Sequence, residues 1–240
     1  MKPLAKLRDL VVLCSVLAGS AASAQTPVPT PSPATAEIPG NPWERTIEGF
    51  ELQDRKSPPK PGNVVFLGSS SIVRWDLKAS FPGANVVNRG FGGSQISDSI
   101  LFAERILAAH QPRLVVFYAG DNDIGGGKSA ERVREDFEKL VSIIHLRHPK
   151  TRIAFLAVKP SPARWKHIET QRKANGQIVE FIARDTRLQY VDVVTPMLNS
   201  DGQPRPELYA KDGLHLSEEG YKLWNELVRP LVRETARWSR

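Results

Sequence analysis

Short apolar runs that alternate with helix-like stretches are the feature that most restricts the fold of this chain. Five runs are strand-like, and they cover residues 63–67, 85–88, 114–118, 153–158 and 190–194. The apolar spacing after these runs predicts helices near residues 97–109, 129–148, 167–185 and 217–233. Strands that read as continuous apolar runs are covered on both faces. The sequence therefore predicts an α/β fold, a three-layer α/β/α sandwich around a five-stranded parallel sheet.

Polar segments follow four of the predicted strands, three of them directly and the fourth between the last strand and the last helix. The four segments are Gly68-Ser69-Ser70, Asn88-Arg89-Gly90-Phe91-Gly92-Gly93, Gly120-Asp121-Asn122-Asp123 and Asp212-Gly213-Leu214-His215. In a parallel sheet of the flavodoxin-like order 2-1-3-4-5, ligands bind beyond the carboxyl ends of the strands, where the strand order reverses. One rim of the sheet is therefore predicted to carry a hydroxyl, a glycine-rich turn, an amide and an acid–imidazole pair.

These residue types are the ones that acyl transfer from an ester needs. A serine hydroxyl such as Ser70 is a weak nucleophile, and His215 could take its proton as it attacks. Asp212 lies three residues before His215 and could fix the tautomer of the imidazole. The developing oxyanion needs N–H donors, and the Gly93 backbone, the Asn122 side chain and the Ser70 backbone could supply them.

The four segments resemble those of the SGNH hydrolases, the GDSL-type esterase and lipase superfamily, over roughly residues 63–233. The resemblance implies that Ser70 is the nucleophile and that Asp212 and His215 complete a catalytic triad. It also implies that the Ser70 N–H, Gly93 and Asn122 form the oxyanion hole. Neither a metal nor a cofactor is required by this family's chemistry.

Two positions depart from the family pattern. Ser69 stands where an aspartate is usual, and Ser69 and Ser71 are rivals of Ser70 for the role of nucleophile. Asp121 replaces a residue that is often small, and we expect its carboxylate to point away from the oxyanion hole or to contact substrate. Residues 159–162, together with Trp165, follow the fourth strand and form either a pocket wall or a proline-stiffened loop. Ser69, Asp121 and Trp165 are the predicted substrate-pocket residues.

The amino-terminal residues carry the pattern of a secretory signal. A positive segment precedes a short apolar run at residues 10–18, which is too short for a bilayer span of about 20 residues. Ala22-Ser23-Ala24 is a small-x-small cleavage site. We expect residues 1–24 to be a signal peptide that is cut after Ala24, and the protein to be exported, either periplasmic or secreted. No transmembrane segment is expected after cleavage.

A proline-rich stretch at residues 25–40 follows the predicted cleavage site and is expected to be an extended linker. Residues 41–240 then form the predicted hydrolase domain. The single cysteine, Cys14, lies inside the signal, so the mature chain has no disulfide and no Cys nucleophile.

The placement of the charges and of the histidines argues against nucleic-acid binding and against a metal site. The formal net charge is +7, but Lys and Arg are scattered among acids without a basic block, which argues against nucleic-acid binding. His145 and His148 lie three apart on a predicted helix, but no third metal ligand accompanies them.

The predicted function is therefore that of an exported serine esterase that hydrolyses short acyl or acetyl esters through an acyl-enzyme. The alternatives are an acyl hydrolase of lysophospholipase or thioesterase type, and a non-catalytic carbohydrate- or lipid-binding module. O-acetylated polysaccharide and lysophospholipid both stay open as substrates. The sequence does not give the oligomeric state.

Overall fold

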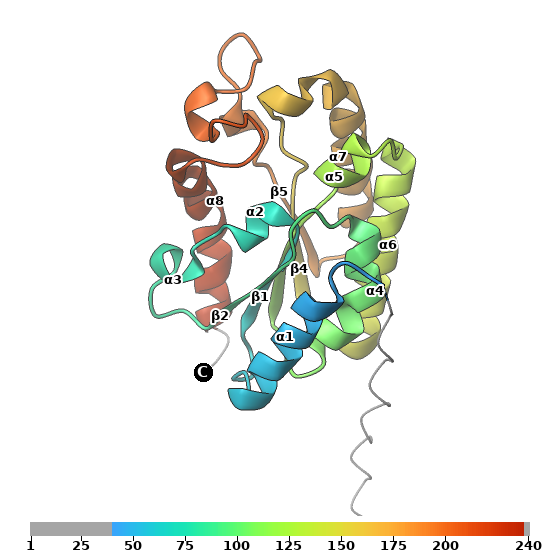
Figure 1. Cartoon of the computed structure of the whole chain (residues 1–240), viewed down its shortest axis with the longest axis vertical. Coiled ribbons are helices and arrows are strands. Elements are labelled where there is room, and N and C mark those ends of the chain that lie inside the picture. Colours follow the sequence, from blue (N-terminus) through green and yellow to red (C-terminus); the bar gives the residue numbers. More distant parts are fainter. Residues whose placement is uncertain (1–39, 238–240) are drawn as a thin grey trace, which may run out of the picture. The chain divides into compact units, whose positions relative to one another are not determined.

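Five parallel strands build one sheet in the order β2-β1-β3-β4-β5 in a computed structural model that describes residues 40–237 (Figure 1). The strands are β1 (Val64–Gly68), β2 (Val86–Gly90), β3 (Leu114–Tyr118), β4 (Arg152–Leu156) and β5 (Leu188–Val191). The predicted α/β class and strand order are confirmed. The predicted signal peptide and nearly all of the predicted linker lie outside the described residues, so both stay predictions.

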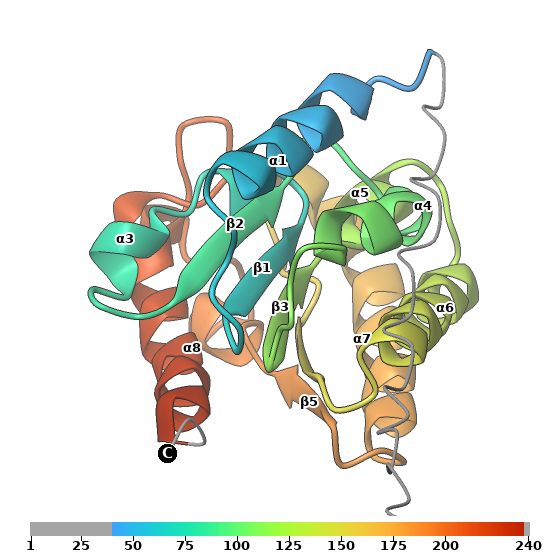
Figure 2. The same ribbon diagram turned by 90° about the horizontal axis from the view of Figure 1, so that it is seen from below.

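Helices cover both faces of the sheet, which makes three layers (Figure 2). One face carries α1 (Glu44–Lys56), α4 (Ile96–Leu107), α6 (Ala130–Arg147) and α7 (Ile168–Ile182). The other carries α2 (Ser70–Val73), α3 (Leu77–Ser80) and α8 (Glu218–Arg237). Successive side chains of β1 alternate between the two cores: Val65 and Leu67 pack into the first, and Phe66 into the second. Double coverage explains why the inner strands β1 and β3 are apolar and buried along their whole length.

Two strands end earlier than the sequence predicts. In both cases a side chain forms hydrogen bonds with backbone groups that would otherwise continue the strand. The fifth strand was expected at residues 190–194, but it ends at Val191, because the Asp192 carboxylate accepts the N–H groups of Val194 and Thr195 and bends the chain. The fourth was expected to reach Val158. Instead, the Asn175 side chain bonds both the N–H and the C=O of Val158 at 2.9 and 3.0 Å.

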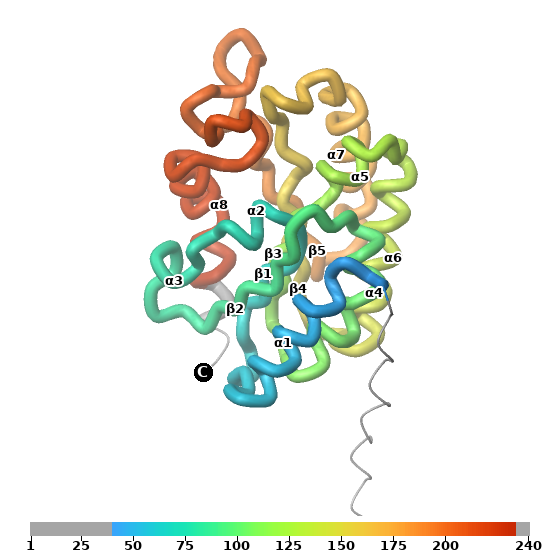
Figure 3. Tube along the Cα trace, viewed as in Figure 1, coloured from blue at the N-terminus to red at the C-terminus, as the bar shows by residue number. Residues whose placement is uncertain are grey.

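Short helices that the sequence pattern did not predict gather at the carboxyl end of the sheet. They are α2, α5 (Asp121–Gly125) and three single-turn helices, η1 (Pro162–His167), η2 (Thr195–Met197) and η3 (Pro206–Leu208). Figure 3 follows the chain through these segments, which rise beyond the strands. Within residues 40–237, no helix has both the length and the apolar character that crossing a bilayer would require.

Candidate active site

The chain makes a sharp exit from β1 that brings Ser70 to the carboxyl end of the sheet. Gly68 has a φ of +140°, and a Cβ built on it would lie 1.9 Å from the Tyr118 carbonyl oxygen on β3. Only glycine fits this conformation and this close approach. The Ser69 N–H then donates to the same carbonyl at 3.0 Å. Ser70 follows as the first residue of α2, half-buried at the surface of the site.

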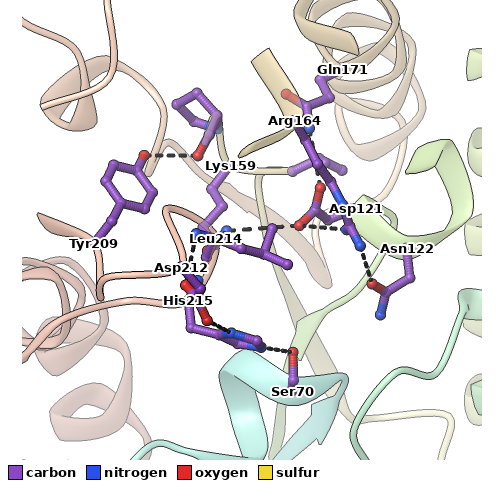
Figure 4. A network of polar contacts seen from close by, with 12 residues as sticks. Ser70, Asp121, Asn122, Lys159, Arg164, Gln171, Tyr209, Asp212, Leu214 and His215 are labelled. Carbon is purple, nitrogen blue, oxygen red and sulfur yellow. Dashed lines mark hydrogen bonds and ion pairs between the residues drawn. The ribbon is translucent and has the colours of Figure 1, made fainter. Parts of the chain in front are cut away.

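A chain of two hydrogen bonds joins Ser70, His215 and Asp212 (Figure 4). The Ser70 Oγ lies 3.1 Å from His215 Nε2, and His215 Nδ1 lies 2.6 Å from Asp212 Oδ2. A carboxylate can only accept, so Nδ1 carries the proton and Nε2 of the neutral ring is free to accept from the hydroxyl. The arrangement can therefore move a proton from the hydroxyl to the imidazole as the oxygen attacks a carbonyl carbon.

The turn at residues 212–215 holds its own carboxylate in place. Asp212 Oδ1 accepts the backbone N–H groups of Leu214 and His215, both at 2.9 Å. The hydrogen bond from His215, aided by these two N–H groups, holds the pKa of Asp212 well below its usual range. The carboxylate is thus charged at neutral pH, and the 46% exposure of its side chain to water also favours the charged form.

Burial separates the three consecutive serines that the sequence left as rivals. Ser69 and Ser71 are each 3% exposed, and neither hydroxyl contacts the imidazole. Ser70 is the serine whose hydroxyl meets His215. Ser69, which was also predicted to line the substrate pocket, lies in the protein interior.

Three N–H groups lie free near Ser70, and they belong to the predicted oxyanion-hole residues. Among the residues that the structure describes, the backbone N–H groups of Ser70 and Gly93 have no hydrogen-bond partner. Asn122 Nδ2 donates one hydrogen to the Ser94 carbonyl at 3.0 Å, which leaves its second hydrogen unused. The Gly93 turn adjoins the serine, because a Cβ built on Gly92 would lie 3.9 Å from the Ser70 Cβ. Such donors can stabilise a negative oxygen.

Asp121 faces away from solvent and is enclosed by cationic and amide groups (Figure 4). Its Oδ2 pairs with Arg164 Nη1 at 2.9 Å and lies 3.7 Å from Lys159 Nζ. Its Oδ1 accepts from Gln171 Nε2 at 3.2 Å. The two cations offset the negative charge that would otherwise repel an oxyanion next to Asn122.

Lys159 links this cluster to the imidazole turn. It is 1% exposed, and its Nζ donates to the Leu214 carbonyl at 2.7 Å. Burial lowers the pKa of the Lys159 ammonium, and the nearby Asp121 carboxylate opposes that shift.

No charge role was predicted for Lys159, and Arg164 was not among the predicted site residues. Lys159 belongs to the segment of residues 159–162 that was predicted to be either a pocket wall or a proline-stiffened loop, and Arg164 lies between that segment and Trp165. Trp165, predicted to line the pocket, lies half-buried on η1.

One protein-family model matches a part of this chain that includes all four polar segments. The model of the GDSL-like lipase/acylhydrolase family matches residues 67–223. The GDSL esterase/lipase WDL1 of Oryza sativa subsp. japonica is 26% identical over 220 residues, covering 75% of this chain and 82% of the relative.

The platelet-activating factor acetylhydrolase IB subunit alpha2 of Rattus norvegicus is also 26% identical, over 208 residues. That match covers 80% of this chain and 86% of the relative. Among solved structures, a GDSL-like lipase from Bacteroides thetaiotaomicron superimposes with a TM-score of 0.68 at 20% identity. The superposition covers 78% of this chain and 97% of that structure, and it shows that the two proteins share a fold. The family model spans well over half of the sequence, and the chain belongs to the GDSL-like lipase/acylhydrolase family.

Proposed function

We propose that this protein is a serine esterase that cleaves short acyl or acetyl esters through a covalent acyl-enzyme. The observation that carries the proposal is the chain from the Ser70 hydroxyl to His215 at 3.1 Å and on to Asp212 at 2.6 Å. The family supports ester hydrolysis in general. The proposal adds the residues and the acyl class.

In the first half of the reaction, Ser70 Oγ attacks the ester carbonyl carbon while its proton moves to His215 Nε2. The Asp212 carboxylate stabilises the imidazolium that forms. The carbonyl oxygen becomes negative and takes hydrogen bonds from the Gly93 N–H, the Asn122 amide and the Ser70 N–H. The carbon–oxygen bond to the alcohol then breaks, and His215 returns the proton to the departing alkoxide.

In the second half, water attacks the acyl-enzyme. His215 takes one proton from the water as its oxygen bonds to the acyl carbon. The bond between that carbon and Ser70 Oγ breaks, the serine regains a proton from the imidazolium, and the carboxylic acid leaves. Every proton is carried by the same imidazole nitrogen, which explains why the hydroxyl and the imidazole must be in direct contact.

Hydrolysis of p-nitrophenyl acetate tests the reaction, and Ser70→Ala is the decisive variant. We expect this variant to lose the measurable turnover and to resist labelling by a fluorophosphonate, which reacts with an activated serine. Ser71→Ala is the matched control, because Ser71 is the next residue of α2, is 3% exposed and does not contact His215. It is expected to keep both properties. Wild-type turnover by Ser70→Ala contradicts the proposal.

The acyl preference needs a separate measurement. A relative of this chain carries the name acetylhydrolase, which supports a short acyl group. We expect kcat/KM to fall along a series of p-nitrophenyl esters from acetate to decanoate. A maximum at the long esters would favour the lysophospholipase-type alternative.

Export is also part of the proposal and rests on residues 1–24 of the sequence. The protein recovered outside the cytoplasm of an expressing cell is expected to begin at Gln25. A mature protein that begins at Met1 contradicts cleavage of a signal peptide.

A further inference from the structure

Two amide groups next to Ser70 carry proposed oxyanion donors, and the oxygen of each amide is held by a hydrogen bond. One is the peptide group between Gly92 and Gly93, and the other is the side chain of Asn122. Because both amides belong to the proposed oxyanion hole, the inference rests on the proposed function.

Trp43, just before α1, holds the first amide. Its indole Nε1 donates to the Gly92 carbonyl oxygen at 2.9 Å, and its ring meets Phe91 edge-on with the centroids 6.1 Å apart. The described chain has no cis peptide bond, and in a planar trans peptide the C=O and the N–H point in opposite directions. Holding the Gly92 oxygen toward the indole therefore directs the Gly93 N–H away from Trp43.

Arg164, on η1, holds the second amide (Figure 4). Its Nη2 donates to Asn122 Oδ1 at 3.0 Å, while Asn122 Nδ2 donates to the Ser94 carbonyl at 3.0 Å. A guanidinium only donates and a carbonyl only accepts, so the two partners together fix which end of the amide is nitrogen. The guanidinium is itself anchored by its ion pair with Asp121 at 2.9 Å.

We propose that Trp43 and Arg164 are positioning residues of the oxyanion hole, each donating to the oxygen of an amide whose N–H faces the reacting carbonyl. Neither side chain needs to touch the substrate. Two effects follow from the same contacts. Each amide is held in one orientation, and a donor on the amide oxygen polarises the group and strengthens its N–H as a donor. Loss of either contact should weaken stabilisation of the transition state while leaving the triad intact.

Trp43→Phe and Arg164→Met test the proposal. The first keeps a ring against Phe91 and removes the indole N–H, and the second removes the guanidinium. Each variant is assayed on p-nitrophenyl acetate and on its thiono analogue, in which sulfur replaces the carbonyl oxygen. Sulfur is a weak hydrogen-bond acceptor, so the thiono ester draws little on the oxyanion hole.

We expect each variant to lower kcat on the oxygen ester about 10-fold, with KM changed less than about two-fold. This loss is smaller than the roughly 10²–10³ for removing a donor outright, because the donor stays in the site. Turnover of the thiono ester should change less than about three-fold, so the oxygen-to-sulfur ratio falls. If both variants lose turnover equally on the two esters, the oxygen-to-sulfur ratio of kcat stays at the wild-type value and the proposal is overturned.

Matched controls separate positioning from general destabilisation. Trp75→Phe also deletes an indole N–H, one that bonds Asn225 Oδ1 at 2.8 Å, and Arg187→Met breaks an ion pair with Asp185. Both controls should lower the melting temperature without moving the oxygen-to-sulfur ratio. If Arg164→Met does not fold, Arg164→Lys replaces it, because it keeps a charge beside Asp121 but lacks the forked N–H groups.

The proposal and the proposed function fail in different ways. If Asn122→Ala lowers the oxygen-to-sulfur ratio while Trp43→Phe and Arg164→Met do not, the positioning role is wrong and the esterase stands. If Ser70→Ala keeps wild-type turnover, the esterase mechanism itself is wrong and the positioning role falls with it.

Discussion

At the scale of single residues, Asp212 combines a strong hydrogen bond with considerable exposure. Its side chain is 46% exposed, yet it holds His215 Nδ1 at 2.6 Å and two backbone N–H groups at 2.9 Å. Its role in the proposed mechanism is to keep the proton on His215 Nδ1 and to stabilise the imidazolium. The backbone contacts preserve the turn even when the charge is removed.

Asp212→Asn is therefore expected to fold normally and to lower kcat by roughly 10²–10³ on p-nitrophenyl acetate. The loss should be below the approximately 10⁴ known for a buried triad acid, because water can replace part of the lost charge at this exposed site. Steady-state kinetics, with melting temperature as the control for folding, measure the effect. A variant with near-wild-type kcat would show that the imidazole needs no carboxylate partner here.

At the scale of elements, the junction between β1 and α2 has the least tolerance for change. Gly68→Ala places a Cβ 1.9 Å from the Tyr118 carbonyl oxygen at a φ of +140°. We expect a loss of roughly 3 kcal/mol or more in the free energy of unfolding, since the backbone conformation alone costs about 1–3 kcal/mol. Urea denaturation gives the value.

Gly176→Ala is the matched control for that substitution. Gly176 lies within α7, and a Cβ built there meets nothing within 4 Å. Alanine should stabilise the helix by about 0.5–1 kcal/mol. The same chemical change is thus expected to have opposite signs at the two sites. A Gly68→Ala protein as stable as the wild type would mean that the β1–α2 junction can relax away from Tyr118.

The elements also show what the sequence can and cannot predict. The inner strands β1 and β3 were recognisable because burial on both faces demands uninterrupted apolar runs. The edge strands β2 and β5 include polar residues and are only partly buried. The helix α1 was not predicted, because Ile47 and Asp54 are its buried residues and most of its surface is charged or polar. It is held by ionic contacts of Arg105 with Glu44 and Glu51 and of Arg89 with Asp54. Such long-range pairings leave no periodic signal.

The same distinction holds for the candidate site. Ser70 and Asn122 were predicted because each follows a strand, and the topology of a parallel sheet brings strand ends together. His215 lies 24 residues beyond β5, and it was predicted from its spacing to Asp212 before the last helix. The contacts of Arg164 with Asn122 and of Lys159 with Leu214 bridge 42 and 55 positions of the sequence. Which charge faces which carbonyl depends on how loops pack, and no local pattern encodes that.

At the scale of the whole molecule, one buried and two half-buried histidines are expected to make the stability of the fold depend on pH. His110 lies between two partners, 2.6 Å from Asn63 Nδ2 and 3.1 Å from Asp54 Oδ2, and is 2% exposed. Burial lowers the pKa of His110. Burial also lowers the pKa values of His145 and His148. All three rings therefore favour the neutral form in the folded state.

The sign of the pH effect follows from linkage. Below the ordinary histidine pKa of about 6.5, the unfolded chain binds protons that the folded chain refuses, so acid favours unfolding. The melting temperature is expected to be level above pH 7 and to fall as the pH drops from about 6.5 toward the lower folded pKa values. His110→Gln should reduce the slope of that fall, because one of the three groups is gone, although its melting temperature at pH 7.5 is also lower. Calorimetry from pH 5 to pH 8 measures both proteins. A wild-type melting temperature that rises or stays level on acidification to pH 5 would contradict the neutral state of the three rings.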